Sequence, residues 1–129
     1  TNNLERLDIL SPIINSLNNP NIIYYRDRGV YEDENVSWCV FSQFQSNIPP
    51  NINDAKGIKI GLFHGPVQGL KTDLGFDFGE EAYDIEKFNG LDIVLCGDIH
   101  KRQSKFIEST LEIDEELFDY YSKKGWEKI

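Results

Sequence analysis

The chain has 129 residues, of which 40% are hydrophobic and 12% aromatic, so it suits one domain with an apolar core and argues against wholesale disorder. Its 13 basic and 22 acidic residues give a formal net charge of −9, which excludes a global electrostatic attraction to nucleic acid. No apolar run reaches the roughly 18 residues of a transmembrane helix, so the sequence predicts no membrane partner.

Cysteine content and the start of the chain indicate the protein's cellular setting and whether the chain is part of a longer protein. The two cysteines form no disulfide framework, which favours a reducing, intracellular setting: cytoplasm, nucleus, or a host cell if the protein is viral. The chain begins with Thr1 and contains no methionine, so we expect a piece of a longer protein.

The first third of the chain predicts a helix followed by β structure. Apolar residues recur at helical spacing over 4–18, where Pro12 is expected to kink or split the helix. A short strand is predicted over 22–26, and the runs 30–33 and 36–42 around acidic turns predict an antiparallel hairpin. Within it, Trp38 and Phe41 are expected in the core.

The middle of the chain predicts a strand–loop–helix–strand unit. After a loop over 45–56, the segment 58–64 predicts a strand, 65–79 a long glycine-rich loop, 80–88 a short helix and 91–97 a buried parallel strand. This order indicates an α/β fold with a parallel sheet, in which chemistry lies at the carboxyl ends of the strands. The remainder, 104–129, predicts an acidic tail with a short strand and a solvated amphipathic helix that includes Leu111.

Both histidines of the chain fall at that edge of the predicted sheet. His64 ends one strand, and Asp98 and His100 follow the other. Imidazole and carboxylate are good ligands for divalent transition metals, so these three residues are candidate metal ligands. Lys101 and Arg102 are candidate contacts for phosphate or DNA.

Each of these assignments has a structural alternative. A histidine is more often a hydrogen-bonded structural residue than a ligand, and a short basic run is usually a solvated loop. Cys96 lies in an apolar run and is interpreted as a buried small residue. The acidic residues of the loop and helix start are explained by solvation and by the helix dipole; they are Asp73, Asp77, Glu80 and Glu81.

The segment 61–103 resembles the C-terminal half of a calcineurin-like metallophosphoesterase domain. The resemblance covers residues 58–103, with weaker similarity back to residue 1, and is greatest to the SbcD-like nuclease subunit of double-strand-break repair complexes. That family has a His-Gly motif after one strand and a Gly-His-x-His motif after the next. Here these are His64-Gly65 and Gly97-Asp98-Ile99-His100.

The resemblance implies half of an αββα sandwich, with residues 1–103 forming the C-terminal portion of the domain and 104–129 a separate tail. It implies two divalent metal ions, manganese or magnesium, with His64 and Asp98 on one and His100 on the other. Asp98 departs from the family pattern, which has histidine there, and a carboxylate at this position favours Mn or Mg over softer ions. The family's Asp-x-His, Gly-Asp-x-x-Asp and Gly-Asn-His-Asp motifs are absent from this chain, and no catalytic residue is identified in it.

The function implied is phosphodiester hydrolysis by a DNA nuclease or exonuclease of repair and recombination, of which this chain is an incomplete and inactive part. The partners implied are DNA, a second copy of the chain and an ABC-type coiled-coil ATPase subunit. Two alternatives stay open. One is a phosphoesterase acting on small phosphoesters or phosphoproteins, and the other is an inert scaffold that keeps the fold for binding. The similarity ends at Gln103, so we expect a missing or diverged segment near 103–104.

Overall fold

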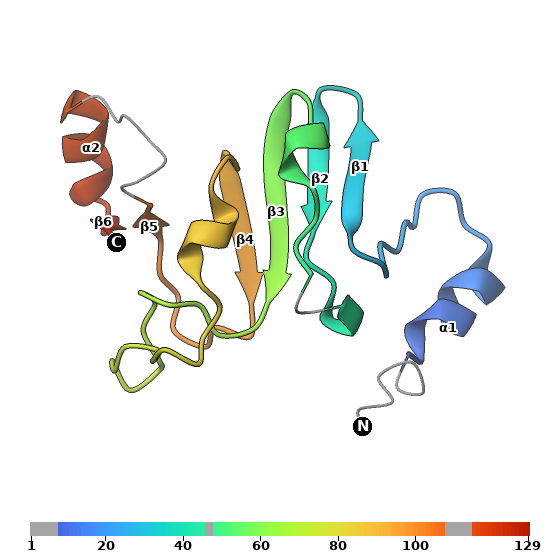
Figure 1. Ribbon diagram of the computed structural model, residues 1–129, viewed down its shortest axis with the longest axis horizontal. Helices are drawn as coiled ribbons and strands as arrows, with labels where there is room; N and C mark the ends of the chain where they lie inside the picture. Colours follow the sequence, from blue (N-terminus) through green and yellow to red (C-terminus); the bar gives the residue numbers. More distant parts are fainter. Residues whose placement is uncertain (1–7, 46–47, 108–114) are drawn as a thin grey trace.

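The computed structural model describes residues 8–45, 48–107 and 115–129. Its centre is a four-stranded mixed sheet in the order β1-β2-β3-β4 (Figure 1). The β1–β2 pair is antiparallel, whereas β3 lies parallel to both β2 and β4. The protein therefore has the α/β fold that the sequence predicts. The strands are β1 (Gly29–Asp33), β2 (Val36–Val40), β3 (Ile58–His64) and β4 (Ile93–Gly97).

The predicted hairpin is confirmed, and its turn contains Glu34 in the left-handed region at φ 52°. The strand predicted over 22–26 is wrong, because this segment forms no strand and joins no sheet in the described part of the chain. Its polar side chains bond to Asp8, two residues before the first helix: Tyr24 Oη donates to Asp8, and so does Arg26 Nε at 2.6 Å. In this segment, side-chain hydrogen bonds to Asp8 take the place of the backbone hydrogen bonds of a β-sheet.

Helix α1 (Leu10–Leu17) runs through Pro12 without a break, whereas residues 4–7 of the predicted helix lie outside the described residues. Pro12 lies in its first turn, where a backbone N–H has no partner within the helix and its loss costs nothing. Asp8 accepts hydrogen bonds from both the backbone N–H and the hydroxyl of Ser11, and so stabilises that turn. Asn18 ends the helix in the left-handed conformation.

The connection from β3 to β4 is mostly irregular. The long loop predicted over 65–79 is confirmed, but the helix predicted over 80–88 is reduced to the 3-10 turn η4 (Ile85–Phe88). The reason is a backbone bridge: Tyr83 N–H donates to Pro66 O, and Gln68 N–H donates to Tyr83 O. This bridge holds Tyr83 in an extended conformation, so a helix can begin only after Asp84, whose side chain accepts from Glu86 N–H. Two further 3-10 turns occur here: η2 (Gln43–Gln45) ends at the first residue of the loop predicted over 45–56, and η3 (Ile52–Asp54) lies within that loop.

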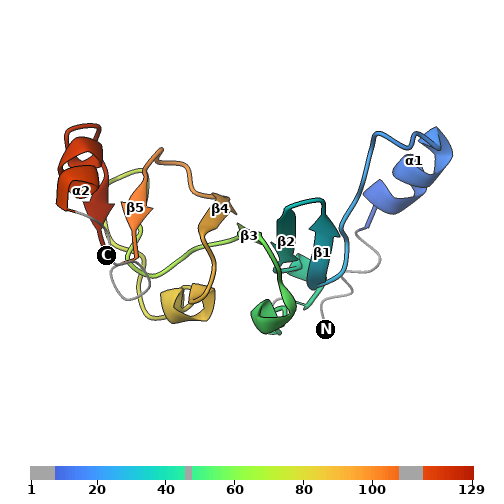
Figure 2. The same cartoon turned by 90° about the horizontal axis from the view of Figure 1, so that it is seen from above.

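The core lies on one face of the sheet. Four aromatic rings pack against each other there, with centroids 4.5–6.2 Å apart; they are Phe41, Phe63, Tyr83 and Phe88. Cys39, Val67 and Leu91 complete the buried cluster. Figure 2 shows η3 (green) and η4 (gold) on the same side of the sheet. Phe41 is in the core as predicted, whereas Trp38 is half-buried on the other face.

The opposite face is apolar and partly exposed, although Val40 is buried on it. The exposed fractions are 50% for Ile58, 49% for Ile93 and 54% for Leu95. The prediction that the β4 segment is buried is therefore wrong for alternate residues, because only Val94 and Cys96 face the core cluster. No helix in the described part of the chain is long and apolar enough to cross a membrane.

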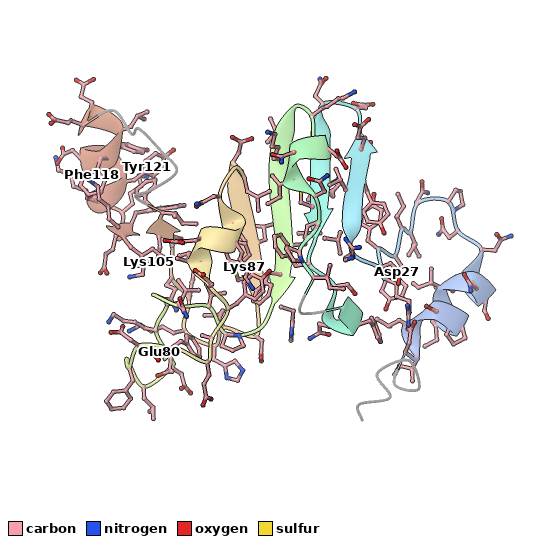
Figure 3. All side chains as sticks on the ribbon, in the orientation of Figure 1. Asp27, Glu80, Lys87, Lys105, Phe118 and Tyr121 are labelled. Carbon is pink, nitrogen blue, oxygen red and sulfur yellow. The ribbon has the colours of Figure 1, made fainter. Side chains whose placement is uncertain are left out.

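The C-terminal unit consists of β5 (Lys105–Phe106), α2 (Glu115–Ser122) and β6 (Glu127–Lys128), with β5 parallel to β6. Phe106, Phe118, Tyr121 and Trp126 form a second aromatic cluster. Figure 3 shows Phe118 and Tyr121 together on α2. Leu111 of the predicted helical stripe lies outside the described residues.

Candidate metal-binding edge of the sheet

The carboxyl edge of β3 and β4 carries all three candidate ligands. His64 is the last residue of β3, and the parallel register pairs it with Gly97, the last residue of β4. Asp98 and His100 follow directly. The parallel pairing thus places the two sequence motifs side by side, as their positions at the strand ends predict.

Gly97 is required by the position of the His64 ring. A Cβ atom at residue 97 would lie 2.7 Å from His64 Cδ2, closer than real Cβ contacts allow. The backbone of the two motifs is also joined, because Gly65 N–H donates to Gly97 O at 3.3 Å. The glycine therefore allows the imidazole to lie over the end of the neighbouring strand.

Asp98 and His100 lie close to each other and open to solvent. His100 Nε2 is 3.8 Å from Asp98 Oδ1, and the side chains are 74% and 51% exposed respectively. The chain turns sharply here, with Asp98 in the left-handed region at φ 62°, a conformation that aspartate adopts more readily than most residues. One carboxylate and one imidazole thus face the same solvent-accessible space.

The three candidates do not gather into one cluster. Within residues 8–45, 48–107 and 115–129, no group of three or more His, Cys, Asp and Glu side chains is placed to hold a metal ion. Asp98 and His100 lie together, and His64 lies at the same edge of the sheet. The His64 side chain, however, forms its hydrogen bond with a different residue. The metal-binding role of the three residues stays a prediction.

The hydrogen-bond partner of His64 is Gln43, which sequence reasoning missed because no pattern connects η2 with either motif. Gln43 Nε2 is 2.6 Å from His64 Nδ1. In this arrangement Nδ1 accepts the hydrogen bond and Nε2 carries the proton. After a half-turn of the amide, Nδ1–H donates to the glutamine oxygen and Nε2 is free to bind a cation. Gln43 therefore decides which nitrogen of His64 is available.

A hollow of about 450 Å³ adjoins His64 and is lined by acidic residues. Glu80, Glu81 and Asp84 contribute carboxylates, and Lys87 lies over the Tyr83 ring at 4.9 Å from its centroid. Figure 3 places Glu80 in the loop and Lys87 on η4. The sequence interpretation of Glu80 and Glu81 as solvated loop residues misses this proximity to His64, since it depends on how the loop folds back.

The basic candidates lie elsewhere. Lys101 and Arg102 are exposed and line a second groove together with His100, not the hollow beside His64. The two motifs thus border two separate depressions in the surface.

Cys96 lies directly before the second motif, and its environment disfavours the reactive thiolate. Burial raises the pKa of its thiol to about 11, so it is protonated at neutral pH. Cys96 is predicted to be buried, whereas in the structure it is half-buried.

Comparison with known proteins yields a relative of undescribed activity. An uncharacterized protein of Acanthamoeba polyphaga mimivirus, R555, is 36% identical over 112 residues, which cover 78% of this chain and 8% of that protein. The chain thus spans 8% of the length of the curated relative it matches. No protein-family model matches the chain, and no solved structure matches it.

Proposed function

We propose that this chain is the C-terminal portion of a calcineurin-like metallophosphoesterase domain of the SbcD-like kind, within a metal-dependent DNA nuclease of repair or recombination. The observation that carries the proposal is the pairing of His64 with Gly97, which sets the His-Gly and Gly-Asp-Ile-His motifs side by side at the carboxyl edge of two parallel strands. Taken alone, the chain binds metal weakly and hydrolyses nothing.

The donor chemistry of the edge fits a divalent cation. Asp98 supplies a hard carboxylate and His100 an imidazole, a combination that suits manganese or magnesium. When bound, two such ions activate a water molecule and neutralise a phosphate in this kind of hydrolysis. The chain's own part is to hold His64, Asp98 and His100 at the edge, with Gln43 setting the tautomer of His64.

The same proposal places the protein inside a cell or a virus-infected host and gives it DNA, a second copy and an ABC-type coiled-coil ATPase as partners. Lys101 and Arg102 then contact the DNA backbone from the groove beside His100. A second candidate function, an inert binding module of the same fold, is favoured by one observation: only two donors meet among the described residues.

Paramagnetic broadening by Mn²⁺ distinguishes the two. In ¹H–¹⁵N spectra of the 129-residue chain, we expect substoichiometric Mn²⁺ to broaden the signals of Asp98, His100 and His64 first. The Asp98→Asn/His100→Ala variant should lose this effect, whereas Glu80→Gln/Glu81→Gln should keep it. Broadening that is confined to other acidic residues, or that survives in Asp98→Asn/His100→Ala, contradicts the metal assignment.

Activity is tested on the longest natural polypeptide that contains this chain. Manganese-dependent degradation of double-stranded DNA ends, abolished by His100→Ala, is the expected result. Hydrolysis of small phosphoesters without DNA degradation supports the phosphoesterase alternative, and full activity in His100→Ala rejects the site.

A further inference from the structure

A groove of about 650 Å³ lies between β4 and the C-terminal unit, and it shares no lining residue with the hollow beside His64. Its floor is apolar and includes Val67, Leu70 and Phe88, each of which is at most 9% exposed. Residues 93–96 of β4 form one wall, and Lys105 and Trp126 belong to the other. Figures 1 and 2 show β4 and β5 as neighbours across this space.

The far wall of the groove is fixed to the main body of the protein. The Gln103 side chain forms two hydrogen bonds with the backbone of Lys71, accepting from its N–H at 3.0 Å and donating to its C=O at 2.9 Å. Ile107 and Ile129 pack against the main core cluster. The groove is therefore preformed, and a ligand would not have to order it.

The wall formed by β4 is an open sheet edge. β4 is the last strand in the sheet order, and in the described part of the chain it pairs only with β3. Gly97 O accepts from Gly65 N–H on the β3 side. Because successive residues of a strand direct their backbone groups to opposite sides, Val94 and Cys96 present theirs to the groove. Such an edge is a template for another strand.

The charge of the groove is opposite to that of the protein. The chain carries −9 overall, yet no aspartate or glutamate lines the groove, whereas Lys101, Arg102 and Lys105 do. Lys105 Nζ is already paired with Glu127 at 2.6 Å. Lys101 and Arg102 are exposed and follow the carboxyl end of β4. An extended ligand along β4 thus meets apolar side chains first and positive charge at one end.

We propose that the edge of β4 docks an extended polypeptide segment with alternating apolar residues and an acidic block at the end that reaches Lys101 and Arg102. Its backbone bonds to Val94 and Cys96, and its apolar side chains pack beside Ile93 and Leu95. This mode of strand addition takes affinity from main-chain hydrogen bonds and specificity from side chains. Along β4 a peptide fits better than a nucleic acid, because the open edge presents alternating N–H donors and C=O acceptors that a peptide backbone matches, and because the floor is apolar. A DNA backbone would be limited to the Lys101 and Arg102 end of the groove. His100 also lines this groove, but the proposal uses no metal ion, since its contacts are the backbone of β4, the apolar floor, and Lys101 and Arg102.

The probes are two acetylated peptides of alternating valine and threonine, one with three glutamates at its N-terminal end and the other with three glutamates at its C-terminal end. Each peptide brings its glutamates to Lys101 and Arg102 in one of the two possible strand directions. We expect one of them to bind the 129-residue chain and to shift the amide signals of Val94 and Cys96. Lys101→Glu/Arg102→Glu should weaken binding about tenfold or more. Lys123→Glu/Lys124→Glu, the same charge change in the turn after α2, should leave it unchanged.

Two further probes test whether the ligand binds through its backbone and whether it is a peptide or a nucleic acid. The same peptide with N-methyl groups on the residues that bond to β4 should lose binding, because its backbone can no longer donate. Equal binding of the methylated peptide, or no binding of either glutamate peptide, overturns the proposal. So does an oligothymidylate that shifts the Val94 and Cys96 signals when the peptides do not.

Discussion

At the scale of single residues, the packing of His64 against Gly97 is the most specific feature of the candidate edge. The imidazole occupies the space that any side chain at residue 97 would fill, and Gln43 holds its Nδ1 from the other side. A ligand that is fixed on two sides loses little freedom when it binds. The arrangement therefore suits a residue whose orientation matters.

Gly97→Ala tests this packing. The new methyl group would lie 2.7 Å from His64 Cδ2, so the ring must move, and we expect a loss of about 1–3 kcal/mol in the free energy of unfolding, as for other overpacked sites. Urea unfolding measures the loss, and the His64 ring signals report the displacement. Gly79→Ala is the matched control, since a Cβ there has no neighbour within 4 Å. Equal stability of the two variants would show that His64 is not held against Gly97.

At the scale of elements, α1 is attached to the rest of the chain through Asp8. Its carboxylate is 6% exposed and bonds to Ser11, Tyr24 and Arg26. The hydrogen bonds from Ser11, together with Arg26, lower the pKa of Asp8 from 3.8 to about 2. One ionised side chain thus links the start of α1 to the segment before β1.

This link predicts an acid-sensitive contact. Because the folded pKa of Asp8 is lower than the unfolded value, its stabilisation is complete above about pH 4 and is lost as the pH falls through about 2. The carboxyl ¹³C signal of Asp8 should titrate with a midpoint near 2, and the Ser11 and Tyr24 signals should follow it. Asp8→Asn should remove that response at Ser11 and Tyr24. A midpoint near 3.8 would mean that the contacts of Asp8 do not persist in solution.

The elements also show where sequence patterns fail. The strand of residues 58–64 is predicted to the residue, because an apolar run ends there at a histidine and a glycine. The strand expected over 22–26 has the same β-branched and aromatic character, yet its hydrogen bonds go to Asp8. The helix expected over 80–88 yields to a backbone bridge from Tyr83 to Pro66. Propensity identifies local preference, whereas these segments are decided by partners distant in the sequence.

Some features of the candidate edge are predictable from the sequence and others are not. That His64, Asp98 and His100 share an edge follows from two strand ends and a parallel crossover, which a sequence pattern can predict. The bond from His64 to Gln43 and its position beside the acidic hollow cannot be predicted from a sequence pattern. The reason is that η2 and the loop of Glu80 reach the edge only through tertiary folding. The resemblance to metallophosphoesterases adds the metal chemistry, and that part remains a prediction.

At the scale of the whole molecule, the described residues cover one face of the sheet and leave part of the other face open, at Ile58, Ile93 and Leu95. Its core face buries Cys39, Phe41 and Phe88, whereas the opposite face exposes about half of each side chain at Ile58, Ile93 and Leu95. Parallel strands are normally covered on both faces. An apolar surface of this kind promotes association between protein molecules.

We therefore expect the chain to self-associate through this face, and replacement of Ile93 and Leu95 by threonine to reduce the association. Because both side chains are already half exposed, the free energy of unfolding should change by no more than about 1 kcal/mol. Val94→Thr/Cys96→Thr is the matched control, since these residues face the core and their replacement should destabilise the fold without removing the exposed surface. Sedimentation velocity over a concentration series measures association, and urea unfolding measures stability. If the Ile93→Thr/Leu95→Thr protein associates as strongly as the unchanged chain, or is destabilised as much as the control, then this face is not the exposed apolar surface that the structure shows.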